Sequence, residues 1–206
     1  MNVKRSILAA GAAVVLCGGT MMLRADMVSE PAEETPEVSG ETSSAGGHAA
    51  NATGGYHFTI PGGIFTVGPI LNRVTFNAKR DSDGTVNGWF MYEQEVDGEA
   101  VRLGGPVTCF KVHDTPVLPG FPDIPAQSQN RAKWGGRIEN TNDPSLLGVF
   151  AWFNSIDNGE GANGWSDIST LVAIGNETAN EAFCNSPNAP NPRFTFAIGG
   201  GNIQVH

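Results

Sequence analysis

Residues 71–96 read LNRVTFNAKR, then DSDG, then TVNGWFMYEQEV. On each side of DSDG the main apolar residues share one parity: Val74, Phe76, Ala78, Val86, Phe90, Tyr92 and Val96. A side-chain period of two is that of a β-strand with one buried face, and Asp83-Gly84 is a tight-turn signal. The stretch therefore predicts a β-hairpin with strands at about 71–80 and 85–96.

Alternation of apolar and polar residues returns around 108–112, 131–139 and 193–198. Residues 146–156 are apolar on both parities, which is typical of a strand that is covered on both faces. Glycine (27 residues) and proline (13) make up about a fifth of the 206 residues and mark the gaps, as at Gly104-Gly105-Pro106. Short strands separated in this way predict an all-β fold, either an antiparallel β-sandwich or a small β-barrel.

The first 25 residues have the features of an export signal. Lys4 and Arg5 supply positive charge at the start, and residues 7–16 form an uncharged apolar run. We therefore predict a signal peptide over 1–25 and a secreted or cell-envelope location. An uncleaved anchor is the alternative, and it would make this N-terminal segment the protein's only contact with a membrane.

Residues 26–53 hold six acidic residues and no basic residue, among many Ser, Thr, Gly, Ala and Pro residues. Such a segment has too little apolar surface to offset the entropy lost on ordering, so we predict a disordered acidic linker. The remaining residues, 54–206, are long enough for a single β-domain with a substantial core.

The formal net charge is −9, from 12 basic and 21 acidic residues. Residues 54–206 hold 15 of the acidic and 9 of the basic residues, so the predicted domain is only mildly acidic. An acidic chain without clustered basic residues is not expected to bind nucleic acid. A hydrophobic content of 40% argues against disorder throughout, and the small number of helix-forming residues argues against a helical bundle.

One segment, residues 176–184, lacks strand periodicity and is predicted to form a short helix that ends before Pro187. Its last residue is Cys184, and Cys109 lies in a predicted strand. Once Cys17 leaves with the signal peptide, an exported chain keeps this pair, which we expect to form a disulfide. A loop of about 75 residues closed in this way is stabilised by about 4 kcal/mol in the chain-entropy model. A reactive thiol or a pair of metal ligands is the less favoured alternative.

Residues 157–167 form a glycine-rich loop with three carboxylates, at Asp157, Glu160 and Asp167. Calcium prefers six to eight oxygen ligands from loops of this kind, so these three residues are candidate metal ligands and Ca²⁺ is the candidate cofactor. The spacing does not match an EF-hand loop. A turn in which Asp and Asn side chains bond to their own backbone is therefore the favoured interpretation, with no cofactor.

Trp89 and Met91 lie on one face of the predicted strand, and Phe90 and Tyr92 lie on the opposite face. If no second sheet covers that face, Trp89 is exposed and can stack against a sugar ring or a partner. Trp165, within the acidic loop, is a second candidate binding residue.

Three short stretches, at 62–67, 157–161 and 201–206, resemble a family of secreted, mostly bacterial β-domain proteins of the post-COAP type. The resemblance covers about residues 62–206. It implies an exported all-β domain and supplies no catalytic residue that could be carried over to this chain. The chain departs from the family pattern in the proline-rich stretch at 116–125 and in its cysteine pair.

Glu93 and Glu95 share a strand face about 7 Å apart. Carboxylate pairs perform glycoside hydrolysis, but a pair on one strand is more typical of a solvated face. The sequence contains no nucleophile elbow, phosphate-binding loop or zinc motif, so it predicts no catalytic residue. The leading hypothesis is an exported non-enzymatic β-domain that has a structural role or binds a ligand or partner of unknown identity. The alternative is a secreted hydrolase or isomerase with carboxylates such as Glu93, Asp157 and Glu160 at the mouth of a small barrel.

Overall fold

The computed structural model describes residues 50–63, 68–116, 118, 127–159, 166–190 and 194–206. Within these ranges the chain is mostly β-strand, with one α-helix and a short 3-10 helix at Pro144–Leu146. The elements are β1 (Ala50–Ile60), β2 (Ile70–Arg80), β3 (Val86–Val96), β4 (Glu99–Thr115), β5 (Gln127–Arg137), β6 (Asn140–Thr141), β7 (Phe150–Ile156), β8 (Ile168–Thr170), β9 (Ala173–Gly175), α2 (Glu177–Asn185), β10 (Thr195–Ala197) and β11 (Gly200–Val205).

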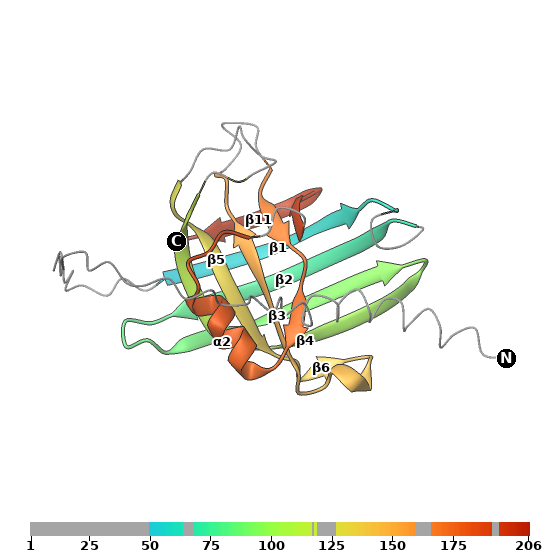
Figure 1. The fold of residues 1–206 in the computed structure, drawn as a ribbon, viewed down its shortest axis with the longest axis horizontal. Coiled ribbons are helices and arrows are strands. Elements are labelled where there is room, and N and C mark those ends of the chain that lie inside the picture. Colours follow the sequence, from blue (N-terminus) through green and yellow to red (C-terminus); the bar gives the residue numbers. More distant parts are fainter. Residues whose placement is uncertain (1–49, 64–67, 117, 119–126, 160–165, 191–193) are drawn as a thin grey trace, which may run out of the picture.

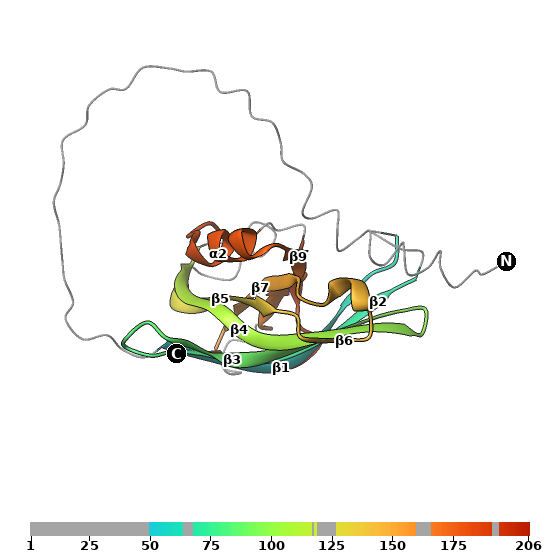
Figure 2. The ribbon, with the colours of Figure 1, turned by 90° about the horizontal axis from the view of Figure 1, so that it is seen from below.

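All these strands belong to one sheet, and every pairing in it is antiparallel. The order is β10-β8-β7-β5-β4-β3-β2-β1-β11, with β6 beside β4 and β9 beside β7. The sheet curls into a half-barrel, so that β11 at one edge contacts β5 and β7 near the other. Figure 2 shows three layers, with α2 over β5 and β7, and β1–β3 beneath them. The predicted all-β antiparallel fold with one short helix is confirmed, in a form between the sandwich and the barrel.

The predicted hairpin is present as β2 and β3, which pair from Ile70 opposite Val96 to Arg80 opposite Val86. Gly84 in the turn has a φ of 89°, a conformation that glycine adopts without strain. The Asp83 side chain accepts a hydrogen bond of 2.9 Å from the backbone N–H of Thr85 and closes the turn.

The core lies between the two halves of the curled sheet. Trp134 is fully buried, with its ring centroid 4.4 Å from that of Phe76 and 3.7 Å from that of Phe153. Its indole N–H donates to the hydroxyl of Ser155 at 3.1 Å, and the buried Tyr56 hydroxyl contacts the same oxygen at 3.3 Å. The aromatic cluster thus keeps its polar atoms hydrogen-bonded, as a stable interior requires.

The Gly104-Gly105-Pro106 sequence corrects a prediction, because it lies inside β4 and not in a gap between strands. The first part of β4 pairs with β3 and the later part with β5, with a register shift just after Pro106. A Cβ on Gly105 would lie 1.9 Å from the carbonyl oxygen of Arg137, so only glycine fits this crossing. In Figure 2, β4 passes from the layer of β1–β3 up toward α2. Glycine therefore lets one strand serve both halves of the sheet.

Two predicted boundaries are also corrected. Strand β1 begins at Ala50, four residues before the predicted start of the domain at 54, because Ala52 is buried and pairs with both β2 and β11. The predicted central strand at 146–156 begins only at Phe150. Leu147, which the apolar pattern placed in that strand, is 61% exposed just after the 3-10 helix.

Helix α2 forms over Glu177–Asn185, close to the predicted 176–184. The side chain of Asn176 caps its start by accepting a hydrogen bond from the backbone of Ala179 at 2.9 Å. Cys184 forms the predicted disulfide with Cys109 in β4, with 6.2 Å between the two Cα atoms. The disulfide therefore attaches the helix to β4, and α2 also contacts β5, over which it lies in Figure 1.

Candidate functional site

The outward face of β3 carries two exposed apolar side chains, Trp89 and Met91. Trp89 is 42% exposed and Met91 is 50% exposed. They face solvent because Phe90 and Tyr92, on the other parity of the strand, are in the core. The backbone N–H of Trp89 donates to the side-chain oxygen of Asn77 on β2 at 2.7 Å. The structure thus places the first predicted binding residue on an open sheet surface.

The antiparallel register aligns the neighbours of these two residues in rows across the sheet. One row runs through Thr53, Asn77, Trp89 and Pro106, and the next runs through Gly55, Thr75, Met91 and Gly104. We call these eight residues the Trp89 face. A Cβ on Gly55 would meet nothing within 4 Å, so the surface beside Thr75 is open. The Trp89 face therefore combines a broad aromatic ring with uncharged hydroxyl and amide groups on neighbouring strands.

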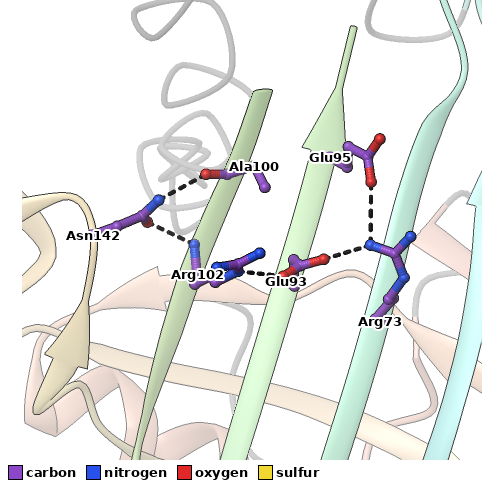
Figure 3. Close-up of polar contacts among 6 residues, drawn as sticks. All are labelled: Arg73, Glu93, Glu95, Ala100, Arg102 and Asn142. Atoms are coloured by element: carbon purple, nitrogen blue, oxygen red, sulfur yellow. Dashed lines mark hydrogen bonds and ion pairs between the residues drawn. The ribbon is translucent and has the colours of Figure 1, made fainter. Parts of the chain in front are cut away.

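A charged row borders the Trp89 face, and Figure 3 shows its contacts. Glu93 on β3 lies between Arg73 on β2 and Arg102 on β4 and forms an ion pair with each. Arg73 also bonds to Glu95 at 3.1 Å. Hydrogen bonds from Arg102 and then Arg73 lower the pKa of the Glu93 carboxyl below its usual value. Glu93 therefore stays ionised near neutral pH and is unsuited to the role of a general acid.

The same row is fixed at its outer end by Asn142, near β6. Its side-chain oxygen accepts a 2.8 Å hydrogen bond from the backbone N–H of Arg102, and its amide group donates to the carbonyl of Ala100 at 2.8 Å (Figure 3). These bonds hold β6 and its loop against β4 beside the charged row.

The acidic loop uses two of its carboxylates to attach itself to the C-terminal strand. Each of the four carboxylate oxygens of Asp157 and Asp167 accepts one backbone N–H: from Gly159 at 2.7 Å, Val205 at 3.0 Å, Asn158 at 2.9 Å and Ile203 at 2.8 Å. This is the kind of backbone bonding that the favoured interpretation of the loop predicts. Both carboxylates therefore have a structural role between β7, β8 and β11.

Glu160 and Trp165, the other two candidate residues of this loop, lie outside the described residues. In the parts of the chain that are described, no three His, Cys, Asp or Glu side chains lie together as a metal site would need. Calcium binding by this loop stays a prediction.

On the other side of the molecule, three basic side chains gather under the end of α2. Arg131 and Lys133 on β5 are 1% and 3% exposed, and His113 on β4 is partly buried. They donate to backbone carbonyls at and beyond the helix end: Arg131 to Pro187 (2.8 Å) and Asn188 (3.0 Å), Lys133 to Phe183 (3.3 Å) and Ser186 (2.7 Å), and His113 to Cys184 (3.1 Å). We call these three residues the basic cluster. Positive charge at a helix C-terminus is favourable, because the helix dipole is negative there.

Burial changes the titration of this cluster. Desolvation, with the nearby Arg131 charge, lowers the pKa of the Lys133 ammonium from 10.5 to about 8. Desolvation is also the main cause that lowers the pKa of His113. At neutral pH Lys133 is therefore still charged, whereas His113 is neutral and donates through its Nε2–H.

Sequence reasoning missed the basic cluster, because lysine and arginine on the polar parity of a strand usually face solvent. The sequence nevertheless contained a pattern that could have predicted the burial of these residues. Cys109 shares its parity with Lys111 and His113, and a disulfide from Cys109 has to bring the helix over that same face. The register then places Arg131 opposite His113 and Lys133 opposite Lys111, beneath the helix.

Comparison of the chain with protein-family models, with curated proteins and with solved structures found no match. The resemblance to the post-COAP type therefore supports no conclusion about function. Among the described residues, no helix has the length and apolar character needed to cross a membrane.

Proposed function

We propose that this protein is an exported, non-enzymatic binding domain and that its Trp89 face binds carbohydrate. The observation that carries the proposal is the 42% exposure of Trp89 within two uncharged rows of the sheet. Contiguous exposed apolar side chains mark interaction sites, and Trp89 and Met91 are neighbours on the same face of β3. The flat indole ring suits the apolar C–H face of a sugar, and its N–H remains available to a hydroxyl group.

The neighbours of Trp89 favour a sugar over a purely apolar partner. Asn77 and Thr75 on β2, and Thr53 on β1, present amide and hydroxyl groups in the same rows. Groups of this kind donate to and accept from hydroxyls, which sugars present on every side. Gly55, beside Thr75 in the row of Met91, has open space over it, where a second sugar ring can lie.

The charged row supports binding more than hydrolysis. A glycosidase needs one carboxylic acid that holds its proton and a second carboxylate across the scissile bond. Glu93 is held ionised by two arginines, and Asp157 is bonded through both oxygens to backbone N–H groups in another part of the fold. These two carboxylates therefore give the hydrolase alternative no support.

Export is supported by three features taken together. The features are the predicted signal peptide with its basic residues and apolar run, the predicted acidic linker, and the disulfide between Cys109 and Cys184. Disulfides of this structural type persist outside the reducing cytoplasm. The predicted linker would then separate the Trp89 face from the membrane anchor or from the site of signal-peptide cleavage.

The test is binding of the disulfide-bonded protein to insoluble polysaccharides and to an array of soluble glycans. We expect binding to at least one of them, and Trp89→Ala should weaken it by about tenfold or more, corresponding to about 1.4 kcal/mol. Leu147→Ala is the matched control, because Leu147 is 61% exposed and lies outside the Trp89 face. Absence of glycan binding, or equal binding by Trp89→Ala, would overturn the proposal.

A further inference from the structure

The Trp89 face draws its residues from four neighbouring strands, of which β1, β2 and β3 form one layer in Figure 2. Its β4 residues, Gly104 and Pro106, lie at the border of this layer, because β4 leaves it after Pro106 to pair with β5. Trp89 on β3 therefore lies near one end of the face, and Gly55 on β1 lies two strands away. The face is thus extended in the direction that crosses the strands.

Across the strands, both rows of the face stay uncharged from β3 to β1. The first row passes from Trp89 to Asn77 and Thr53, and the second passes through Thr75 to Gly55. All five residues are exposed. The side-chain oxygen of Asn77 accepts the backbone N–H of Trp89 at 2.7 Å, which leaves its amide nitrogen as the donor. A ligand that crosses the strands therefore meets hydroxyl or amide groups on both β2 and β1.

Along β3, by contrast, charged residues border the face at both ends. The next outward residue beyond Met91 is Glu93, which forms ion pairs with two arginines. In the other direction Asn87 lies opposite Lys79, which forms an ion pair with Asp81. Each of these cations has a carboxylate partner within the protein, so the borders offer no excess of either sign to a charged ligand. A neutral ligand is therefore favoured.

The spacing of the strands suits an extended chain of sugars. Adjacent strands of a sheet are about 4.8 Å apart, which is close to the length that one ring adds to an extended glycan. A ring stacked on Trp89 and a ring over the open position at Gly55 lie two strands apart, so one further ring fits between them over β2. A helical glycan turns successive rings away from a surface and would lose this contact.

We infer that the ligand of the Trp89 face is an extended, uncharged glycan of the β-1,4-linked type, which crosses β3, β2 and β1 with one sugar ring on each strand. This assignment rests on the proposed carbohydrate binding and adds the shape and charge of the sugar. The ring on β3 stacks against the Trp89 indole, the ring on β2 exchanges hydrogen bonds with Thr75 and Asn77, and the ring on β1 lies over Gly55.

Calorimetric titration of the disulfide-bonded protein with oligosaccharides of one to five rings tests this assignment. The β-1,4-linked oligomers of glucose, N-acetylglucosamine, mannose and xylose are extended, whereas the α-1,4-linked oligomers of glucose are helical. In at least one extended series we expect the affinity to rise at least about tenfold from two rings to three, and the helical series to bind at least about tenfold more weakly. The affinity should also be equal at about 0.05 M and about 0.5 M salt, because no charge on the ligand is involved.

Gly55→Leu is the decisive variant, because it fills the position of the third ring. A Cβ on Gly55 would meet nothing within 4 Å, so the new side chain extends into solvent and the protein should unfold at the temperature of the parent. The variant should bind the three-ring sugar at least about tenfold more weakly and the two-ring sugar as the parent does. Thr59→Leu is the matched control, since Thr59 is an exposed residue on the same side of β1 outside the Trp89 face.

The outcomes distinguish this assignment from the proposal on which it rests. If no glycan binds, or if Trp89→Ala binds as the parent does, both fail. If a glycan binds through Trp89 but Gly55→Leu keeps full affinity for three rings, carbohydrate binding stands and the course across the strands is overturned. Tighter binding of an acidic or a helical glycan than of every neutral extended one would overturn it as well.

Discussion

The Trp89 face with its charged row and the surface beneath α2 arise from the same sequence pattern, yet they have opposite environments. Each surface is formed by the side chains at the polar alternate positions of long neighbouring strands. Basic residues are present on both. On the first, Arg73 and Arg102 form exposed ion pairs with Glu93. On the second, Arg131 and Lys133 are buried and donate to main-chain carbonyls. Strand parity thus defines which side chains share a face, and the disulfide-linked helix decides which face is covered.

The largest effect is expected from loss of the disulfide that holds the helix over the second face. Replacing Cys109 and Cys184 together by serine should lower the free energy of unfolding by about 4 kcal/mol, the chain-entropy value for a loop of this length. Guanidinium denaturation of parent and variant measures it. A loss below about 1 kcal/mol would show that α2 is held by its other contacts alone.

Breaking the basic cluster should come next. Arg131→Ala removes a buried guanidinium that donates to the carbonyls of Pro187 and Asn188, and we expect a loss of about 3 kcal/mol. Arg102→Ala is the matched variant on the exposed side and should change stability little, since surface ion pairs contribute little. Equal losses from the two substitutions would contradict the contrast between the faces.

The crossing of β4 and β5 is the third test, because it connects the two halves of the sheet. Gly105→Ala places a Cβ where the carbonyl oxygen of Arg137 now lies, and we expect a loss of about 2 kcal/mol or more. Gly55→Ala, where a Cβ would meet nothing within 4 Å, is the control in the same sheet. Thermal unfolding distinguishes them, and a tolerated Gly105→Ala would mean that the crossing can widen.

The smallest expected effect is a dependence of stability on pH that comes from Lys133. Its pKa is about 8 in the folded protein against 10.5 for a free lysine, so the unfolded chain binds more protons between these values. The free energy of unfolding should therefore rise as pH increases from about 8 toward 10, because the cost of the buried charge disappears. Denaturation at several pH values should show this slope in the parent and not in Lys133→Met. A parent slope that is flat or negative relative to the variant would contradict the shift.

Much of the fold could be predicted because its signals are local. The alternation in 71–96, the turn at Asp83-Gly84, the helix at 176–184 and the cysteine pair each depend on a few neighbouring residues. Gly104-Gly105-Pro106 was misread, since glycine at a gap and glycine at a close strand crossing look alike until the partner strand is known. The burial of Arg131 and Lys133 was missed for a related reason, because periodicity does not say what packs on a face.

The candidate binding surface was partly predictable. The parity of Trp89 placed it opposite the core residues Phe90 and Tyr92, and only its exposure had to come from the structure. The open position at Gly55 could not be predicted, because its place in the row of Thr75 and Met91 depends on the register of three strands.

The most direct test of the binding proposal is an NMR titration of the isotope-labelled protein with a soluble oligosaccharide that it binds. We predict that the indole N–H signal of Trp89 and the amide signals of Thr75 and Asn77 shift with the sugar concentration. The indole N–H of Trp134, which is buried and bonded to Ser155, should stay in place. Shifts confined to residues away from the Trp89 face would contradict the account.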